Sequence, residues 1–210
     1  MIPTKEEFIK GIKEYEKREK RDAMYKVALF IINHFLDKKD LEMVTNGLGV
    51  LLLTWNQAFY RYGEFDFDKL ERCIKNNFEI IIEFRKRRIE SLSSNDEFHI
   101  KTLFNELLNA LSISRGKRKG RKSPVAVAKA LHLLAPNFFP LWDEKISRGY
   151  HCFYDKDPAE KYTRFMYIMK EFVRKVKELY LDSDVETLKS KGILKLIDEY
   201  NYSKYTKGWI

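Results

Sequence analysis

Residues 112–135 read SISRGKRKGRKSPVAVAKALHLLA, and this stretch shows most plainly how the chain is built. It begins with a loop that holds two glycines and six basic residues, and it ends in a run of alanine, valine and leucine. Between them stands Ser123-Pro124. A serine oxygen can cap free backbone N–H groups, and proline suits the first helical position, where no N–H is needed. The stretch therefore predicts a turn followed by a well-capped helix.

Similar helix starts recur along the chain. Several capping residues are followed three positions later by glutamate, so that each side chain can bind a free backbone N–H of the other residue. These pairs are Thr4 with Glu7, Asp68 with Glu71, Ser94 with Glu97, and Ser183 with Glu186. Asp157-Pro158 repeats the Ser123-Pro124 pattern, and Asp22 is a further candidate cap.

Apolar residues recur at intervals of three and four over most of the chain, which indicates amphipathic helices. The predicted segments are 4–20, 22–36, 41–61, 69–91, 95–113, 124–135, 141–151, 158–181 and 184–202. No pair of stretches shows the Val, Ile and Thr alternation between turn dipeptides that predicts paired strands. We therefore expect an all-α protein of eight or nine helices. Residues 1–210 should form a single domain, compact or divided into two lobes around a cleft.

Composition excludes several classes of protein. Hydrophobic residues make up 44% and charged residues 34% of the chain, which is typical of a globular protein and excludes global disorder. The two cysteines, Cys73 and Cys152, and the four histidines lack the spacing of metal ligands, so we expect no disulfide, no metal and no cofactor. Abundant Glu, Lys and Ile with a single glutamine, Gln57, indicate a heat-adapted source.

Apolar runs such as 50–53 are too short to cross a bilayer, and the first residues do not resemble a signal peptide. We therefore expect a cytoplasmic protein with no membrane partner. We also expect it to be a monomer.

The net charge of +9 is concentrated in one loop. Six of the eight residues from Arg115 to Lys122 are basic, and without these six the net charge would be +3. A solvated loop without a partner is the simplest interpretation of such a run. Here two glycines interrupt the run and helices are predicted on both sides, so residues 112–123 form a candidate helix-hairpin-helix element. Its backbone N–H groups would face a phosphate, which makes double-stranded DNA the expected partner. The residues expected to bind DNA are Arg115, Gly116, Lys117, Arg118, Lys119, Gly120, Arg121 and Ser123.

Two stretches resemble the helix-hairpin-helix DNA glycosylase superfamily, and within it the archaeal 8-oxoguanine DNA glycosylase group. Residues 51–58, LLLTWNQA, are similar to an apolar family helix that ends in Leu-Thr-x-Asn and faces the DNA gap left by a flipped base. Residues 120–122, GRK, with the helix 125–134 and residues 140–143, PLWD, are similar to the hairpin end, the packing helix and the closing aspartate of the family. The resemblance implies an enzyme that flips out and excises a damaged base, with or without AP lyase activity.

The resemblance also implies roles for particular residues. Lys122 would attack the sugar C1′, because an amine at a helix N-terminus beside other cations loses its proton more easily. Asp143 would stabilise the positive charge that develops on the sugar. The interval of 21 residues between them is longer than in the family, so Lys129 is a second candidate for the nucleophile. Asn56, Gln57 and Trp142 are the candidate base-pocket residues.

Structural interpretations stand beside these functional ones. Asp143 is as well suited to cap the helix that follows it. For Trp142 and for the tyrosines near the C-terminus, a place in the core is the favoured interpretation. For Lys129, an ordinary lysine at the surface or at the edge of a cleft is the favoured interpretation, because it lies inside the predicted helix. The alternative function is a non-catalytic helix-hairpin-helix module that binds DNA or RNA. A third class is a helical interaction or toxin-related domain whose basic loop binds RNA or an acidic partner.

Overall fold

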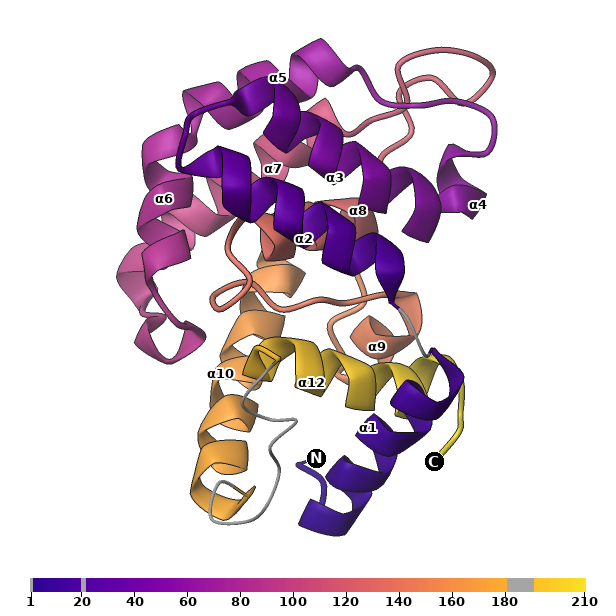
Figure 1. The fold of residues 1–210 in the computed structure, drawn as a ribbon, viewed down its shortest axis with the longest axis vertical. Coiled ribbons are helices and arrows are strands. Elements are labelled where there is room, and N and C mark those ends of the chain that lie inside the picture. The colour runs from indigo at the N-terminus through magenta and orange to yellow at the C-terminus, as the bar shows by residue number, and fades with distance from the viewer. Residues whose placement is uncertain (1, 20–21, 181–190) are drawn as a thin grey trace.

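The computed structural model describes residues 2–19, 22–180 and 191–210, and within these ranges it contains helices and no strands (Figure 1). The all-α prediction is confirmed. The helices are α1 (Lys5–Arg18), α2 (Ala23–Leu36), α3 (Leu41–Trp55), α4 (Gln57–Tyr60), α5 (Phe67–Asn76), α6 (Phe78–Lys86), α7 (Glu97–Ala110), α8 (Pro124–Leu134), α9 (Glu144–Gly149), α10 (Pro158–Tyr180) and α12 (Ile193–Asn201). Two 3₁₀ turns, η1 (Ile89–Ser91) and η2 (Ser94–Asp96), and a π-helical turn, η3 (Tyr202–Thr206), complete the described elements.

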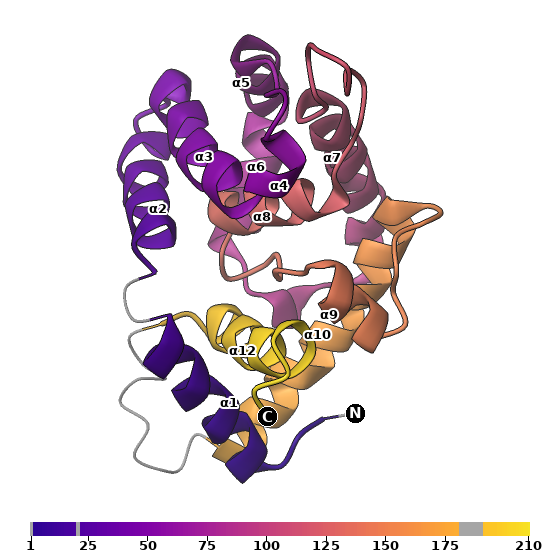
Figure 2. The same cartoon turned by 90° about the vertical axis from the view of Figure 1, so that its right-hand side faces the viewer.

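The helices form two groups (Figures 1 and 2). Helices α2 to α8 make an upper group, and α1, α9, α10 and α12 make a lower group. The first helix therefore packs against the last one, α12, although nearly the whole sequence separates them. Both termini lie in the lower group. The chain crosses between the groups after α1 and again after α8, and these crossings bring distant residues to the boundary.

Two predicted helices are each broken at an asparagine. The predicted segment 41–61 divides into α3 and α4 at Asn56, whose ψ of 29° leaves the helical region. The predicted segment 69–91 divides into α5 and α6 at Asn77, whose side-chain amide donates to the carbonyl of Cys73. Asparagine offers the backbone such competing hydrogen bonds and weakens a helix interior. These breaks raise the number of α-helices in the described ranges to eleven.

Most helix starts lie where the sequence predicts them. The Thr4 side chain accepts from the N–H of Glu7, and the Ser123 side chain accepts from the N–H of Ala126, so both caps are confirmed. Helix α10 begins at Pro158, as predicted.

Other predicted starts need correction. Helix α5 is capped by Asp66 and not by Asp68, because the chain turns two residues earlier than predicted. The capping box before α7 joins Ser93 to Asp96 and not Ser94 to Glu97. Asp22 precedes α2 in a left-handed conformation and makes no capping hydrogen bond. The predicted pair Ser183 and Glu186 lies outside the described residues.

A buried histidine joins the helices of the upper group. His132 of α8 is fully buried, and its Nε2 lies 3.0 Å from the hydroxyl of Tyr25 in α2. Its Nδ1 lies 2.8 Å from the carbonyl oxygen of Phe139. A carbonyl can only accept, so Nδ1 carries the proton and Nε2 accepts from the tyrosine. Burial lowers the pKa of His132 to about 4, because the charged ring would lose its hydration.

This histidine should make the fold sensitive to acid. The unfolded chain binds a proton at His132 near pH 6.5, whereas the folded chain does so only near pH 4. Its contribution to stability is therefore complete above pH 6.5 and is lost as the pH falls from there to about 4. Between pH 7 and pH 4 we expect the free energy of unfolding to fall by about 3 kcal/mol more in the parent protein than in His132→Gln. Urea unfolding of both proteins at the two pH values measures this difference, and equal losses would contradict it.

Candidate functional site

The basic loop folds as a short hairpin between α7 and α8. The N–H of Gly120 donates to the carbonyl of Ile113, and the N–H of Ile113 donates to the carbonyl of Arg121. Gly116 and Gly120 have φ values of 80° and 83°, a left-handed conformation that glycine adopts without strain. The buried Ile113 anchors the hairpin, while the basic side chains stand at the surface.

Contacts with the segment after α4 fix the direction of the hairpin. The N–H of Ser114 donates to the carbonyl of Glu64, and the Arg115 guanidinium pairs with the Glu64 carboxylate at 3.1 Å. Arg118 lies over the exposed ring of Tyr62, 5.2 Å from its centroid. Lys117, Lys119 and Arg121 are exposed. Cations are thus gathered beside the capped N-terminus of α8, where a phosphate would be favoured.

Lys122 belongs to this surface. Its amine donates to Asn109 Oδ1 at 2.5 Å, and the side chain is exposed. It does not line the central cavity described next. The structure thus places Lys122 with the hairpin cations and apart from Asp143.

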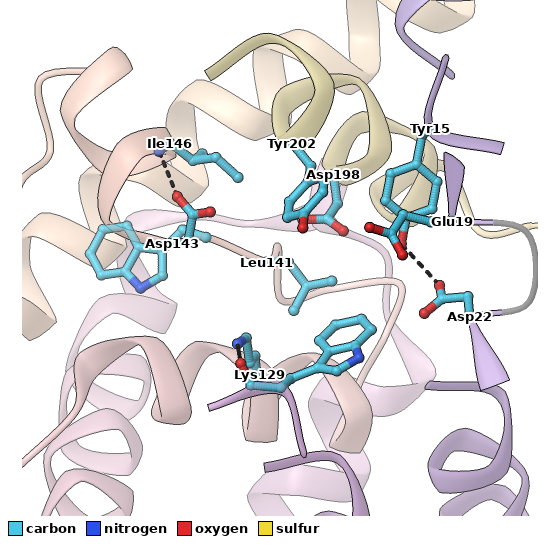
Figure 3. A pocket seen from close by; sticks show the side chains of 11 residues that line it. Tyr15, Glu19, Asp22, Lys129, Leu141, Asp143, Ile146, Asp198 and Tyr202 are labelled. Carbon is cyan, nitrogen blue, oxygen red and sulfur yellow. Dashed lines mark hydrogen bonds between the residues drawn. The ribbon is translucent and has the colours of Figure 1, made fainter. Parts of the chain in front are cut away.

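A central cavity of about 310 Å³ lies between the upper and lower groups of helices (Figure 3). The upper group supplies Trp55 and Lys129, and the rest of the wall comes from the lower group and the connecting segments. The lining residues are Tyr15, Glu19, Asp22, Trp55, Lys129, Leu141, Trp142, Asp143, Ile146, Asp198 and Tyr202. Figure 3 shows Lys129 on one side of this space, with Asp143 and Asp198 on the other. One volume therefore joins an amine and carboxylates from opposite groups of helices.

Lys129 is held at the point where α3 ends. Its Nζ donates to the carbonyl oxygen of Trp55 at 3.1 Å and to Oδ1 of Asn56, and it lies 5.6 Å from the centroid of the Trp55 ring. Burial lowers the pKa of this amine to about 8, although the carboxylates of Asp198 and Asp143 act in the opposite direction. About a tenth of Lys129 is then uncharged at pH 7, a far larger share than for an ordinary lysine.

Asp143 has one oxygen engaged in a helix cap and the other in a contact with the C-terminal turn. Oδ1 accepts from the N–H of Ile146 at 2.8 Å, so the predicted cap of α9 is confirmed. Oδ2 accepts from the hydroxyl of Thr206 at 2.5 Å. Gly149 permits this approach of η3, since a Cβ there would lie 2.6 Å from the ring of Tyr205. The carboxylate is therefore held at the cavity by contacts on both sides.

A buried ion network forms the far wall. Lys195 of α12 is 4% exposed, and its Nζ lies 3.1 Å from Asp22 and 3.2 Å from Asp198. Burial alone would lower the pKa of Lys195, but Asp198 and the neighbouring carboxylates hold it well above its usual range. Burial raises the pKa of Asp198, against the effect of Lys195. Lys195 thus remains a cation inside the fold and joins α12 to the start of α2.

The three candidate base-pocket residues are separated by the structure. Trp142 lines the central cavity, but it is 1% exposed and its ring packs among core aromatics. Asn56 is buried beside Lys129, and its Nδ2 has no hydrogen-bond partner. Gln57 is exposed and lines a shallow depression next to the hairpin, together with Arg61 and Arg115.

Sequence reasoning missed several residues of the cavity. Glu19, Asp22 and Asp198 come from the ends of three different helices, and nothing in their local sequence marks them as neighbours. Trp55 stands within the Leu-Thr-x-Asn stretch, directly before the candidate base-pocket residue Asn56, and this position is the signal that could have identified it. Tyr202 follows α12 and was expected to seal the core; its ring lines the cavity.

In the described ranges, no helix is both long and apolar enough to pass through a membrane. In the same ranges, no three His, Cys, Asp or Glu side chains are grouped so that they could hold a metal ion. Comparisons of the chain with protein-family models, with curated proteins and with solved structures give no match.

The lowered pKa of Lys129 can be tested without a substrate. Only the uncharged amine reacts with acetic anhydride, so acetylation of Lys129 should rise with a midpoint near pH 8. Lys101 provides a matched control, because Glu160 and Glu97 raise its pKa and its reaction should still increase above pH 10. Peptide mass spectrometry after short reaction times at pH 6 to 11 follows both residues. A shared midpoint above pH 10 would contradict the environment described for Lys129.

Proposed function

We propose that this protein binds damaged duplex DNA, receives a flipped-out base in the central cavity and cleaves its glycosidic bond, with Lys129 as the nucleophile and Asp143 as the stabilising carboxylate. The single observation that carries the proposal is the placement of a lysine of lowered pKa and an aspartate in one cavity with aromatic walls. Cavities with perturbed titratable groups and a few converging polar atoms are where catalysis is expected.

The hydrogen bonds of Lys129 suit a nucleophile. An uncharged amine has two N–H bonds and one lone pair, and two acceptors are in place, the Trp55 carbonyl and Asn56 Oδ1. Both N–H bonds can be used in these contacts. The lone pair is then left over, on an amine that lines the cavity. In this proposal the helix break at Asn56 has a function, because the Trp55 carbonyl and the Asn56 side chain at the break are the two acceptors.

The proposed step exchanges the base for Lys129 at C1′ of the sugar. Lys129 Nζ forms a bond to C1′ of the sugar while the bond from C1′ to the base nitrogen breaks, and the base leaves with that electron pair. Positive charge develops on the sugar and is stabilised by the Asp143 carboxylate. The attacking nitrogen then loses a proton, and opening of the sugar ring gives an imine between Nζ and C1′. The imine can support strand cleavage.

The hairpin would place the duplex over this cavity. Its exposed cations lie at the N-terminus of α8, and Lys129 lies within the same helix. Contacts of this kind hold the DNA backbone without reading sequence. In this arrangement Lys122 binds a phosphate, and the resemblance to the glycosylase superfamily is kept with the nucleophile moved to Lys129.

The nucleophile can be identified by trapping. Borohydride should reduce the imine and link the protein to duplexes that carry a susceptible lesion. We expect Lys129→Gln to abolish the adduct and Lys122→Gln to retain it, because only Lys129 of the two lines the cavity.

Asp143→Asn should slow base release about a hundredfold or more, because the charge that stabilises the sugar is lost. The variant should still cap α9, since asparagine caps about as well as aspartate.

The controls separate chemistry from folding. Melting temperatures of the three variants should stay near that of the parent protein. An adduct that survives in Lys129→Gln and disappears in Lys122→Gln would transfer the role to Lys122. Absence of both adduct and base release over a panel of oxidised, deaminated and alkylated lesions would favour the non-catalytic module.

The role of the hairpin is tested by salt. Each phosphate contact that a lysine or arginine makes releases counterions, so the logarithm of affinity falls by about 0.9 per contact for each tenfold rise in salt. Changing Lys117, Lys119 and Arg121 together to glutamate should flatten this slope by about 3 and weaken binding to every duplex sequence. Changing Lys161, Lys170 and Lys175 of α10 to glutamate is the control of equal charge. Equal effects of the two triple changes, measured by fluorescence anisotropy, would remove the hairpin from the interface.

A further inference from the structure

The central cavity is acidic, although the protein is basic. Four of its lining residues are carboxylates, Glu19, Asp22, Asp143 and Asp198, whereas Lys129 is the one lysine of the lining. Lys195 compensates Asp22 and Asp198 from behind the wall. Neither Glu19 nor Asp143 forms an ion pair with the described part of the chain. The four carboxylates therefore outnumber the two lysines that act on them, Lys129 and Lys195, and a ligand in the cavity meets net negative charge.

The rest of the wall is aromatic. Tyr15, Trp55, Trp142 and Tyr202 contribute rings to the lining. The faces of such rings stack on flat heterocycles, and they also attract cations. Two of these rings already attract a cation of the protein itself: Lys195 Nζ lies 4.8 Å from the ring centroid of Tyr15 and 5.4 Å from that of Trp55. The volume of about 310 Å³ is at the small end of ligand pockets and suits one heterocycle.

The charge of the cavity also selects among leaving groups. A neutral base departs with the electron pair of the glycosidic bond, so it becomes an anion unless it gains a proton. The excess of carboxylates over lysines at the cavity would disfavour that anion. A base that carries a positive charge before the bond breaks departs as a neutral molecule. The same carboxylates then stabilise both the bound cation and the positive charge left on the sugar.

We infer that the base received by this cavity is a purine made cationic by alkylation of a ring nitrogen. This inference rests on the proposed function and narrows it. It differs from the oxidised base that the sequence resemblance suggests, because an oxidised guanine brings no positive charge to the acidic wall.

The test compares lesions that differ in charge. Duplexes of one sequence carry N7-methylguanine or N3-methyladenine, which are cationic, or 8-oxoguanine or hypoxanthine, which are neutral. Single-turnover release of each base is divided by its spontaneous release without protein. We expect the acceleration to be roughly tenfold or more greater for the cationic pair. Acceleration of the neutral pair alone, or of both pairs equally, would overturn the inference and leave the proposed function standing. Absence of acceleration for all four would overturn both.

Two variants test whether the preference for cationic bases depends on the carboxylates of the cavity. Glu19→Gln removes an exposed carboxylate of the cavity, and we expect it to lower the acceleration for cationic bases roughly two- to fivefold, with little change for neutral ones. Glu14→Gln changes the same helix away from the cavity and should alter neither. Melting temperatures show whether both variants are folded. A preference that persists unchanged in a folded Glu19→Gln protein, or that falls equally in Glu14→Gln, would overturn the role given to the acidic wall.

Discussion

The buried ammonium of Lys195 is the interaction on which the boundary between the two groups of helices depends. It joins Asp198 and Glu199 of α12 to Asp22, which precedes α2, and it touches the hydroxyl of Tyr15 in α1. A buried charge is tolerated only when partners replace its lost hydration, and removal of one partner leaves the others uncompensated. Loss of Lys195 would leave Asp22 and Asp198 without a paired cation among the described residues, whereas Glu199 would keep Lys191 at 3.0 Å. The central cavity shares Asp22 and Asp198 with this network, so its shape and its charge are set together.

Lys129 and Lys195 show how one boundary can produce two kinds of lysine. Lys195 has carboxylates in direct contact, and its pKa is raised. Lys129 has two neutral oxygens as its acceptors, and burial lowers its pKa to about 8. Lys195 is the more deeply buried of the two, so its higher pKa comes from its partners and not from its depth of burial. In the proposed function the two lysines have different roles. Lys195 stabilises the carboxylates of the cavity wall, and Lys129 supplies an uncharged amine.

Positive and negative charge are kept on separate parts of the molecule. The hairpin gathers exposed cations at the N-terminus of α8, whereas the cavity gathers carboxylates from the lower group and the segment that enters α2. A duplex held by the first would be kept out of the second by the repulsion of its phosphates. Only a base, which carries no phosphate charge, would be drawn inward. The proposed preference for a cationic base follows from this separation, because the carboxylates gathered at the cavity attract positive charge.

The sequence by itself determined the helical class, several of the helix starts and the existence of a basic hairpin, because these depend on local capping, periodicity and glycine. It also marked Asp143 and, as a second candidate, Lys129. It did not show that Asn56 and Asn77 break their helices, since the competing hydrogen bonds depend on the surroundings. Nor did it show which lysine lines the cavity, because Lys122 stands just before α8 and Lys129 within it, and only the packing of α8 against Trp55 brings Lys129 to the cavity. Glu19, Asp22 and Asp198 meet through tertiary structure alone: burial and charge compensation act between residues that are distant in the chain, and no local pattern records them.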